Sequence, residues 1–403
     1  HDPSKYYLTP SQTYFLHFFD PVSWYFTFLI DCSSSPSFVD DFCRVLVNSS
    51  FTAFSFNSSG LPLFCNPASI LVVEHSYASR SSFYSDLISV ADTAVNSLNP
   101  ALAVNACLNR VEVEDEGTVF CLCAFPHFLI DYISMQLLLD SAMSSSSDLR
   151  YSLGFPVSTF NIPLEIPDHF KQIQNCHNLI VADSDFRSVF KPESYQFHEI
   201  LVDLPHKFSS LTSGYSSRLL PYLVASVVTT LTSDQNGCPL IDLEFGSRDY
   251  NDLSCSNSIG YFSLHIPCLF DDFNVESLSH SIRDIQANSS SLFSYLSTYP
   301  DTVRMTPICS INCIDLAFSG ISNGLNIIRH SLSTAESFPL SWSPLMLEAE
   351  CSAEQLKVNF YFDEKQVTYS TVKKLISHLE SSLATIVSLP EEDTTDIINR
   401  LGW

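Results

Sequence analysis

The 403-residue chain has few basic side chains, with 19 Lys and Arg against 44 Asp and Glu, and its formal net charge is −25 with histidine neutral. Phosphate backbones and anionic lipid surfaces are held mainly by clustered Lys and Arg. The shortage of both argues against nucleic acid and membranes as partners. Glycine is also scarce, at 10 residues, and the sequence contains no glycine-rich phosphate-binding motif.

Long apolar runs and secretory signals are absent as well. The run from Leu219 to Leu231 is too short to span a bilayer, and the first residues lack the basic stretch and apolar core of a signal peptide. The 13 cysteines are an odd number without a repeating spacing. Neither Cys121 with Cys123 nor Cys309 with Cys313 has the two-residue spacing of common zinc sites. We therefore expect a cytoplasmic protein with reduced, buried thiols, no metal and no bound cofactor.

The chain does have enough apolar material for a large core, since 45% of its residues are hydrophobic. At roughly 100–200 residues per domain, the length predicts about two domains. Strand-like and helix-like segments alternate in both halves, which favours a layered α/β (α+β) fold. A stretch with little periodicity and three prolines lies between Phe155 and Pro167. We predict an N-terminal subdomain at 1–160, a connector at 161–195 and a C-terminal subdomain at 196–403.

The C-terminal half contains several segments of clear expected form. Residues 199–204 and 259–266 are each expected to form one strand, and residues 275–291 a helix. Residues 218–232 are expected to form a buried helix, in which Pro221 is tolerated only in the first turn.

Two strand-like runs, Ala103–Val113 and Thr118–Phe125, are joined by a turn of acidic residues and glycine and predict a β-hairpin. The hairpin leads to the strongest candidate site, His127 and Asp131 in an HxxxD pattern. A histidine at the end of an apolar strand can act as a general base, because imidazole titrates near neutral pH. Asp131 lies where a loop meets the next helix, so its carboxylate can cap that helix or pair with an arginine. Taken alone, the pattern is explained equally well by a core histidine. His280 repeats the pattern within a polar helical stretch, where a structural role is favoured.

Four segments, in this order, resemble motifs of the condensation domains of nonribosomal peptide synthetases, which are chloramphenicol-acetyltransferase-like acyltransferases. Leu8-Thr9-Pro10-Ser11-Gln12 resembles the first motif. Pro126-His127 to Asp131, with Ser134, takes the place of the HHxxxDG motif. Gly246-Ser247-Arg248, followed by Ile259-Gly260-Tyr261-Phe262, is similar to the glycine-arginine segment and the IGxF strand, and 358–363 resembles the last strand. The resemblance covers nearly the whole chain.

The resemblance implies two chloramphenicol-acetyltransferase-like subdomains in a V-shaped pseudo-dimer with a tunnel between them. It implies condensation-type acyl transfer, in which a carrier-bound acyl or peptidyl donor is joined to a carrier-bound acceptor amine. Both substrates would arrive on phosphopantetheine arms of carrier protein domains, and adjacent synthetase domains would be further partners. His127 takes the place of the functional histidine. Asp131 takes the structural place, with Arg248 as its suggested partner.

Departures from the family pattern leave a second function open. Pro126 stands where the family has its first histidine, and Tyr132 replaces the glycine after the aspartate, where its ring would narrow the tunnel. Residues 50–56 lack the arginines usual there. The alternative is a catalytically degenerate condensation-like domain that recruits a tailoring oxygenase. A free-standing acyltransferase using coenzyme A is a more distant alternative, because no basic cluster suits the phosphates of that cofactor.

Overall fold

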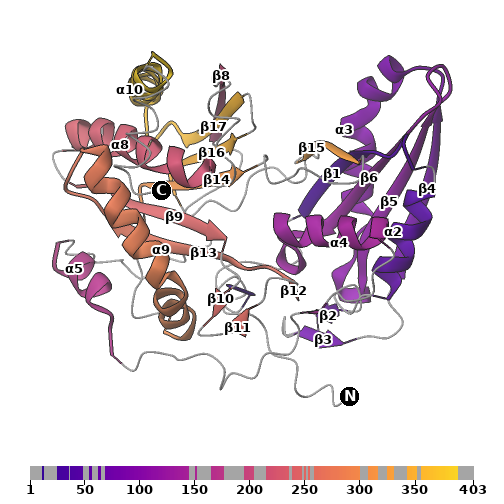
Figure 1. Cartoon of the computed structure of the whole chain (residues 1–403), viewed down its shortest axis with the longest axis horizontal. Coiled ribbons are helices and arrows are strands. Elements are labelled where there is room, and N and C mark those ends of the chain that lie inside the picture. Colours follow the sequence, from indigo (N-terminus) through magenta and orange to yellow (C-terminus); the bar gives the residue numbers. More distant parts are fainter. Residues whose placement is uncertain are drawn as a thin grey trace. The chain divides into compact units, whose positions relative to one another are not determined.

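A computed structural model of the chain contains two compact units (Figure 1). Unit 1 consists of His1–Asn161, Arg248–Phe262 and Ile321–Leu340, and unit 2 of Ile162–Ser247, Ser263–Gly320 and Ser341–Trp403. The structure describes residues 11–12, 25–35, 37–48, 54–56, 62–64, 69–144, 150–151, 165–176, 195–203, 215–235, 238–246, 249–250, 253–254, 258–299, 307–315, 325–330, 343–351 and 355–388.

The two units are not the contiguous ranges 1–160 and 196–403 expected from the sequence. Arg248–Phe262 and Ile321–Leu340, from the second half of the chain, belong to unit 1. The second of these segments contains the strand β15 (Asn326–His330), which pairs with β1 (Tyr25–Asp31). Periodicity identifies a strand but does not say which sheet it joins, so the sequence did not show this exchange.

Unit 1 is built on a five-stranded sheet with the order β15-β1-β6-β5-β4. Strands β5 (Val104–Val113) and β6 (Thr118–Pro126) form the predicted antiparallel hairpin, and β1 pairs antiparallel with β6. β4 (Ser69–Tyr77) pairs parallel with β5 at the edge. β6 is therefore the central strand.

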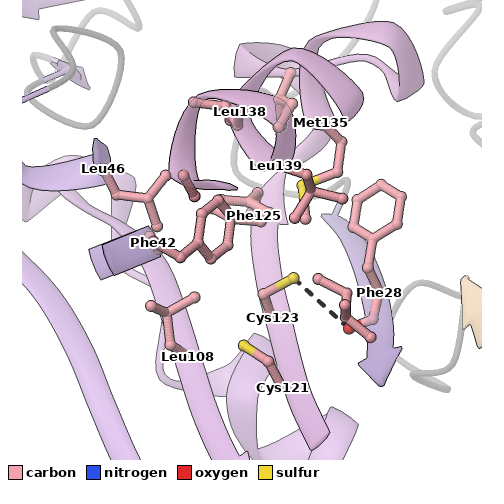
Figure 2. Close-up of a cluster of buried hydrophobic side chains, with 14 of the residues drawn as sticks. Phe28, Phe42, Leu46, Leu108, Cys121, Cys123, Phe125, Met135, Leu138 and Leu139 are labelled. Carbon is pink, nitrogen blue, oxygen red and sulfur yellow. Dashed lines mark hydrogen bonds between the residues drawn. The ribbon is translucent and has the colours of Figure 1, made fainter. Parts of the chain in front are cut away.

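Both faces of this sheet are buried, which is why β6 reads as an unbroken apolar run. Cys121, Cys123 and Phe125 point to the face covered by α2 (Phe38–Val47) and α4 (Tyr132–Ser144). Figure 2 shows this core, in which the Cys123 thiol donates to the Phe28 carbonyl at 3.6 Å. Phe120, Leu122 and Ala124 point to the other face, where α3 (Arg80–Asn96) packs. Alternation along one strand thus fills two cores.

The other elements of unit 1 are short. They are β2 (Phe54–Phe56), β3 (Pro62–Phe64), the 3₁₀ turns η3 (Pro100–Leu102) and η4 (His127–Leu129), β7 (Arg150–Tyr151), β10 (Asp249–Tyr250), β11 (Leu253–Ser254) and β12 (Ser258–Ile259). β12 pairs in parallel with β7. The single strand expected at 259–266 is instead two, because β12 ends at Ile259 and the next strand begins at Ser263.

Unit 2 is built on a six-stranded sheet with the order β13-β9-β14-β16-β17-β8. β9 is parallel to β14 and β14 to β16, whereas the other neighbours are antiparallel. The strands are β8 (Tyr195–Asp203), β9 (Leu240–Gly246), β13 (Ser263–Leu269), β14 (Cys309–Asp315), β16 (Leu345–Cys351) and β17 (Gln355–Asp363).

The helices described in unit 2 are α5 (Asp168–Cys176), α8 (Tyr215–Gln235), α9 (Val275–Thr298) and α10 (Tyr369–Ser388). α8 packs against β14 and β16, α9 against β13, and α10 against α8. Pro221 lies inside α8, not in its first turn as expected, because the helix begins at Tyr215. Among the described helices, none combines the length and apolarity needed to cross a membrane.

Candidate functional site

The candidate site begins where the central strand of unit 1 ends. Pro126 is the last residue of β6 and pairs with Tyr25 of β1, and His127 follows as the first residue of η4. The 3₁₀ turn closes with a hydrogen bond from the Ile130 amide to the His127 carbonyl at 3.3 Å. The sharp turn after a buried strand therefore places His127 at the C-terminal end of the central strand.

Two aromatic rings fix the plane of the His127 imidazole. The ring stacks on Phe26 of β1, with centroids 4.3 Å apart and planes 16° apart. It also meets Tyr261 edge to face, at 5.3 Å and 85°. His127 itself is half-buried, whereas both neighbours are buried. A half-exposed imidazole held in one orientation can accept or donate a proton at a fixed point.

Asp131 holds the loop that carries His127. Its carboxylate accepts from the Ser134 amide at 2.7 Å, which caps the first turn of α4, and from the Phe262 amide at 3.2 Å. The residue is only 6% exposed. The predicted capping role is therefore present in the structure. Arg248, the suggested partner of Asp131, lies outside the described residues.

Ser134 joins the same two segments through Gly260. Its hydroxyl donates to the Gly260 carbonyl at 2.7 Å, and the Gly260 amide donates to that hydroxyl at 2.9 Å. The Asp131 amide also donates to the Gly260 carbonyl, at 3.1 Å. Asp131 and Ser134 thus bind the residues on both sides of Tyr261. They position Tyr261, and through it the imidazole of His127.

Tyr132 packs within unit 1. Its side chain is half-buried against the core between the sheet and α2 and α4, and its ring centroid lies 6.2 Å from that of Phe28. The ring that replaces the glycine of the family motif therefore contributes to the packing of α4 on the sheet. The predicted narrowing of a tunnel by Tyr132 stays a prediction.

Sequence reasoning assigned no role to three residues that contact the loop. Phe26 and Tyr261 flank His127, and the side-chain amide of Gln12 donates to the Phe128 carbonyl at 3.1 Å. Gln12 and Tyr261 lie in segments quoted for the family resemblance, so order along the chain could have identified them. Phe26 gave no signal, because a buried aromatic residue in a strand is ordinary core composition.

The second HxxxD pattern lies elsewhere. His280 is exposed on α9, and its Nδ1 lies 2.9 Å from the Arg283 guanidinium. Among the described residues, no three His, Cys, Asp or Glu side chains come together as a metal site. Cys107, Cys121 and Cys123 are buried thiols outside any disulfide, and burial raises the pKa of Cys107 to about 11.

Comparison with known proteins gives matches in structure. No family model matches the chain, and no curated protein matches its sequence. The epimerization domain from the third module of tyrocidine synthetase B matches with a TM-score of 0.70 and 12% identity, over 95% of this chain and 97% of that one. VibH, a nonribosomal peptide synthetase condensation enzyme, matches with a TM-score of 0.64 and 13% identity, over 98% and 99%.

A third match is a domain of a polyketide synthase. The condensation domain of the monacolin K polyketide synthase MokA matches with a TM-score of 0.66 and 10% identity, over 96% of this chain and 98% of that one. The chain therefore has the condensation-domain fold, a mixed α/β fold of two subdomains. This confirms the fold class predicted from the sequence. At 10%, 12% and 13% sequence identity, these three matches show a shared fold and nothing further.

Proposed function

We propose that the chain is a condensation-type domain of nonribosomal peptide synthesis, which joins a carrier-bound acyl or peptidyl donor to a carrier-bound acceptor amine. The observation that carries the proposal is the placement of His127. Its imidazole stands at the end of the central strand, held between Phe26 and Tyr261, on a loop bound to residues 260–262. The fold shared with VibH supports the same class of reaction. Carrier proteins, adjacent synthetase domains and a cytoplasmic location belong to the proposal.

In the proposed reaction His127 orients or deprotonates the acceptor amine. The amine nitrogen attacks the donor thioester carbonyl, a C–N bond forms, and the C–S bond breaks. The amine proton passes to the imidazole and then to the leaving thiolate of the phosphopantetheine arm. Asp131 and Ser134 position the loop and touch no substrate.

The recruiting alternative also accounts for the hydrogen bonds of Asp131. Both of its carboxylate oxygens accept from backbone amides, at Ser134 and at Phe262. A domain that had lost its chemistry and recruits a tailoring oxygenase would need those bonds to keep its shape. Asp131 therefore fits either function, and only His127 separates the two.

The test is amide formation by His127→Ala with loaded donor and acceptor carriers. We expect the rate to fall by at least ~10²-fold, the usual range for removing a general base. His280→Ala removes the exposed histidine of the second HxxxD pattern and should leave the rate unchanged. An unaltered rate in His127→Ala would contradict the proposal. Epimerisation of the donor without amide formation would also contradict it. So would a wild-type protein that forms no amide but binds an oxygenase as tightly as His127→Ala does.

A further inference from the structure

A row of polar side chains crosses the whole sheet of unit 2. Each member is the register partner of the next, from one edge strand to the other. Because side chains alternate along a strand, the row lies on the face opposite to the buried residues Ile311, Leu347 and Val358. Neighbouring strands are about 4.8 Å apart, so consecutive members are in reach of one another. The row consists of His265, Glu244, Asn312, Glu348, Asn359 and Glu199.

The row has an unfilled hydrogen-bond acceptor at Asn359. The Asn359 amide nitrogen donates to Glu348 Oε2 at 3.5 Å, so the amide group lies beside that carboxylate. Asn359 is 4% exposed, and its Oδ1 is buried with no hydrogen-bond partner among the described residues. A buried carbonyl oxygen without a donor is costly, by about 1–3 kcal/mol, and such groups are rare in folded proteins. The missing partner is a hydrogen-bond donor.

The residues beside Asn359 already hold one ammonium group. Lys357 Nζ lies 3.5 Å from Glu350 Oε1 and 3.6 Å from Glu199 Oε2. Both distances exceed the roughly 2.7–2.9 Å of a close charge-assisted hydrogen bond. The Lys357 ammonium is therefore shared loosely between two carboxylates, two residues before Asn359 on β17. The chemistry of this cluster suits amine cations. The cluster consists of Asn359, Lys357, Tyr361, Glu199, Glu348 and Glu350.

Tyr361 reports the electrostatic character of the same cluster. Burial, and then the carboxylates of Glu348 and Glu350, raise the pKa of Tyr361 far above its ordinary value. A hydrogen bond to Glu348 and the charge of Glu199 act in the same direction. The phenol stays neutral, and the groups around it favour positive charge.

The cluster is more exposed toward the edge strand β8. The Glu199 side chain is 39% exposed, whereas that of Glu350 is 9% exposed. Phe197 and Leu201, two residues before and after Glu199 on the same face, are exposed large apolar side chains. Two exposed apolar side chains therefore flank Glu199 on the edge strand β8, where the carboxylates are most exposed.

We propose that this cluster binds a primary alkylammonium group. The ammonium donates to Asn359 Oδ1 and to the Glu348 carboxylate, and the aliphatic chain of the ligand lies against Phe197 and Leu201. The site lies within unit 2, so the inference goes beyond the proposed acyl transfer and does not rest on it.

The experiment is calorimetric titration of the full chain with n-pentylamine, and with 1-pentanol as the neutral probe of similar shape. We expect saturable binding of the amine and none of the alcohol at the same concentrations. Glu348→Gln and Asn359→Leu should each weaken amine binding by at least ~10-fold, the effect of losing one charge-assisted or buried hydrogen bond. Glu380→Gln changes the net charge as Glu348→Gln does, but on the exposed side of α10, and should bind like the wild type.

Three results would overturn the inference. They are equal binding of both probes, equal weakening by Glu380→Gln, and loss of all amine binding in 150 mM NaCl, which would indicate attraction by the overall charge alone. Asn359→Ser serves where Asn359→Leu fails to fold, as judged by circular dichroism, and should also weaken binding. His127 belongs to unit 1 and Asn359 to unit 2, so amide formation and the effect of Asn359→Leu on amine binding test the two proposals separately.

Discussion

Replacing Asp131 by alanine should weaken the attachment of the loop that carries His127 to residues 260–262. The carboxylate is 6% exposed and accepts two backbone amides, from Ser134 at 2.7 Å and from Phe262 at 3.2 Å. Loss of a helix cap costs about 1 kcal/mol. A buried amide left without an acceptor, here that of Phe262, costs about 1–3 kcal/mol more. The local stability of this region should therefore fall by about 2–4 kcal/mol.

The measurement is hydrogen exchange of peptides that contain Ser134 and Phe262. It reports local opening, so it does not require the two units to unfold together. A loss of about 2–4 kcal/mol corresponds to exchange roughly 30- to 700-fold faster at the amides protected by this region. Asp131→Asn keeps one acceptor oxygen but turns an NH₂ group toward the other amide, so it should accelerate exchange less than alanine does. Asp115→Asn, in the exposed turn between β5 and β6, is the charge-matched control.

Wild-type exchange rates in Asp131→Ala would refute the stabilising role of the Asp131 carboxylate between the two segments. Acceleration confined to Ser134, with Phe262 unaffected, would reduce Asp131 to a helix cap. The contact with Phe262 would then carry none of the stability assigned to it here.

Two further predictions concern titratable groups. Burial lowers the pKa of His265, but Asp242 at 2.9 Å and Glu244 outweigh burial and raise that pKa above 6.5. The resulting stabilisation is complete below pH 6.5 and is lost as the pH rises through the pKa of His265 in the folded protein. The free energy of unfolding, measured against pH, should therefore fall over this range in the wild type and not in His265→Gln. Burial also raises the pKa values of Cys107 and Cys123. Iodoacetamide should therefore label the exposed Cys238 in the native protein and these two only after unfolding, and native labelling of Cys123 would contradict its burial.

The hairpin that leads to His127 could be predicted from the sequence almost to the residue. Ala103–Val113 and Thr118–Phe125 were expected, and the strands are Val104–Val113 and Thr118–Pro126. β6 is buried on both faces and reads as an apolar run, whereas β5 is mostly buried and also carries polar residues. Gly117 supplies the positive φ of 61° in the turn. Local composition was sufficient because turn and strands are neighbours in the chain.

The partners of Asp131 could not be predicted in the same way. Residues 259–266 read as one strand because the segment is apolar, whereas Gly260, Tyr261 and Phe262 lie between two strands and bind the loop of Asp131 and Ser134. An apolar run indicates burial and does not say which backbone groups pair. The predicted position of Pro221 in the first turn was wrong for a related reason, because it depends on the residue at which α8 begins.

His127 discriminates between acyl transfer and recruitment better than the HxxxD pattern as a whole. Asp131 and Ser134 hold the loop to residues 260–262 through their own side chains. A domain that only recruits a partner needs those bonds, while a flat apolar ring on Phe26 would fill the place of His127 equally well. His127→Phe keeps a ring between Phe26 and Tyr261 and removes only the titratable nitrogens. If this variant still forms amide at the wild-type rate, His127 is a packing residue; if it folds normally and forms none, the imidazole is there for its chemistry.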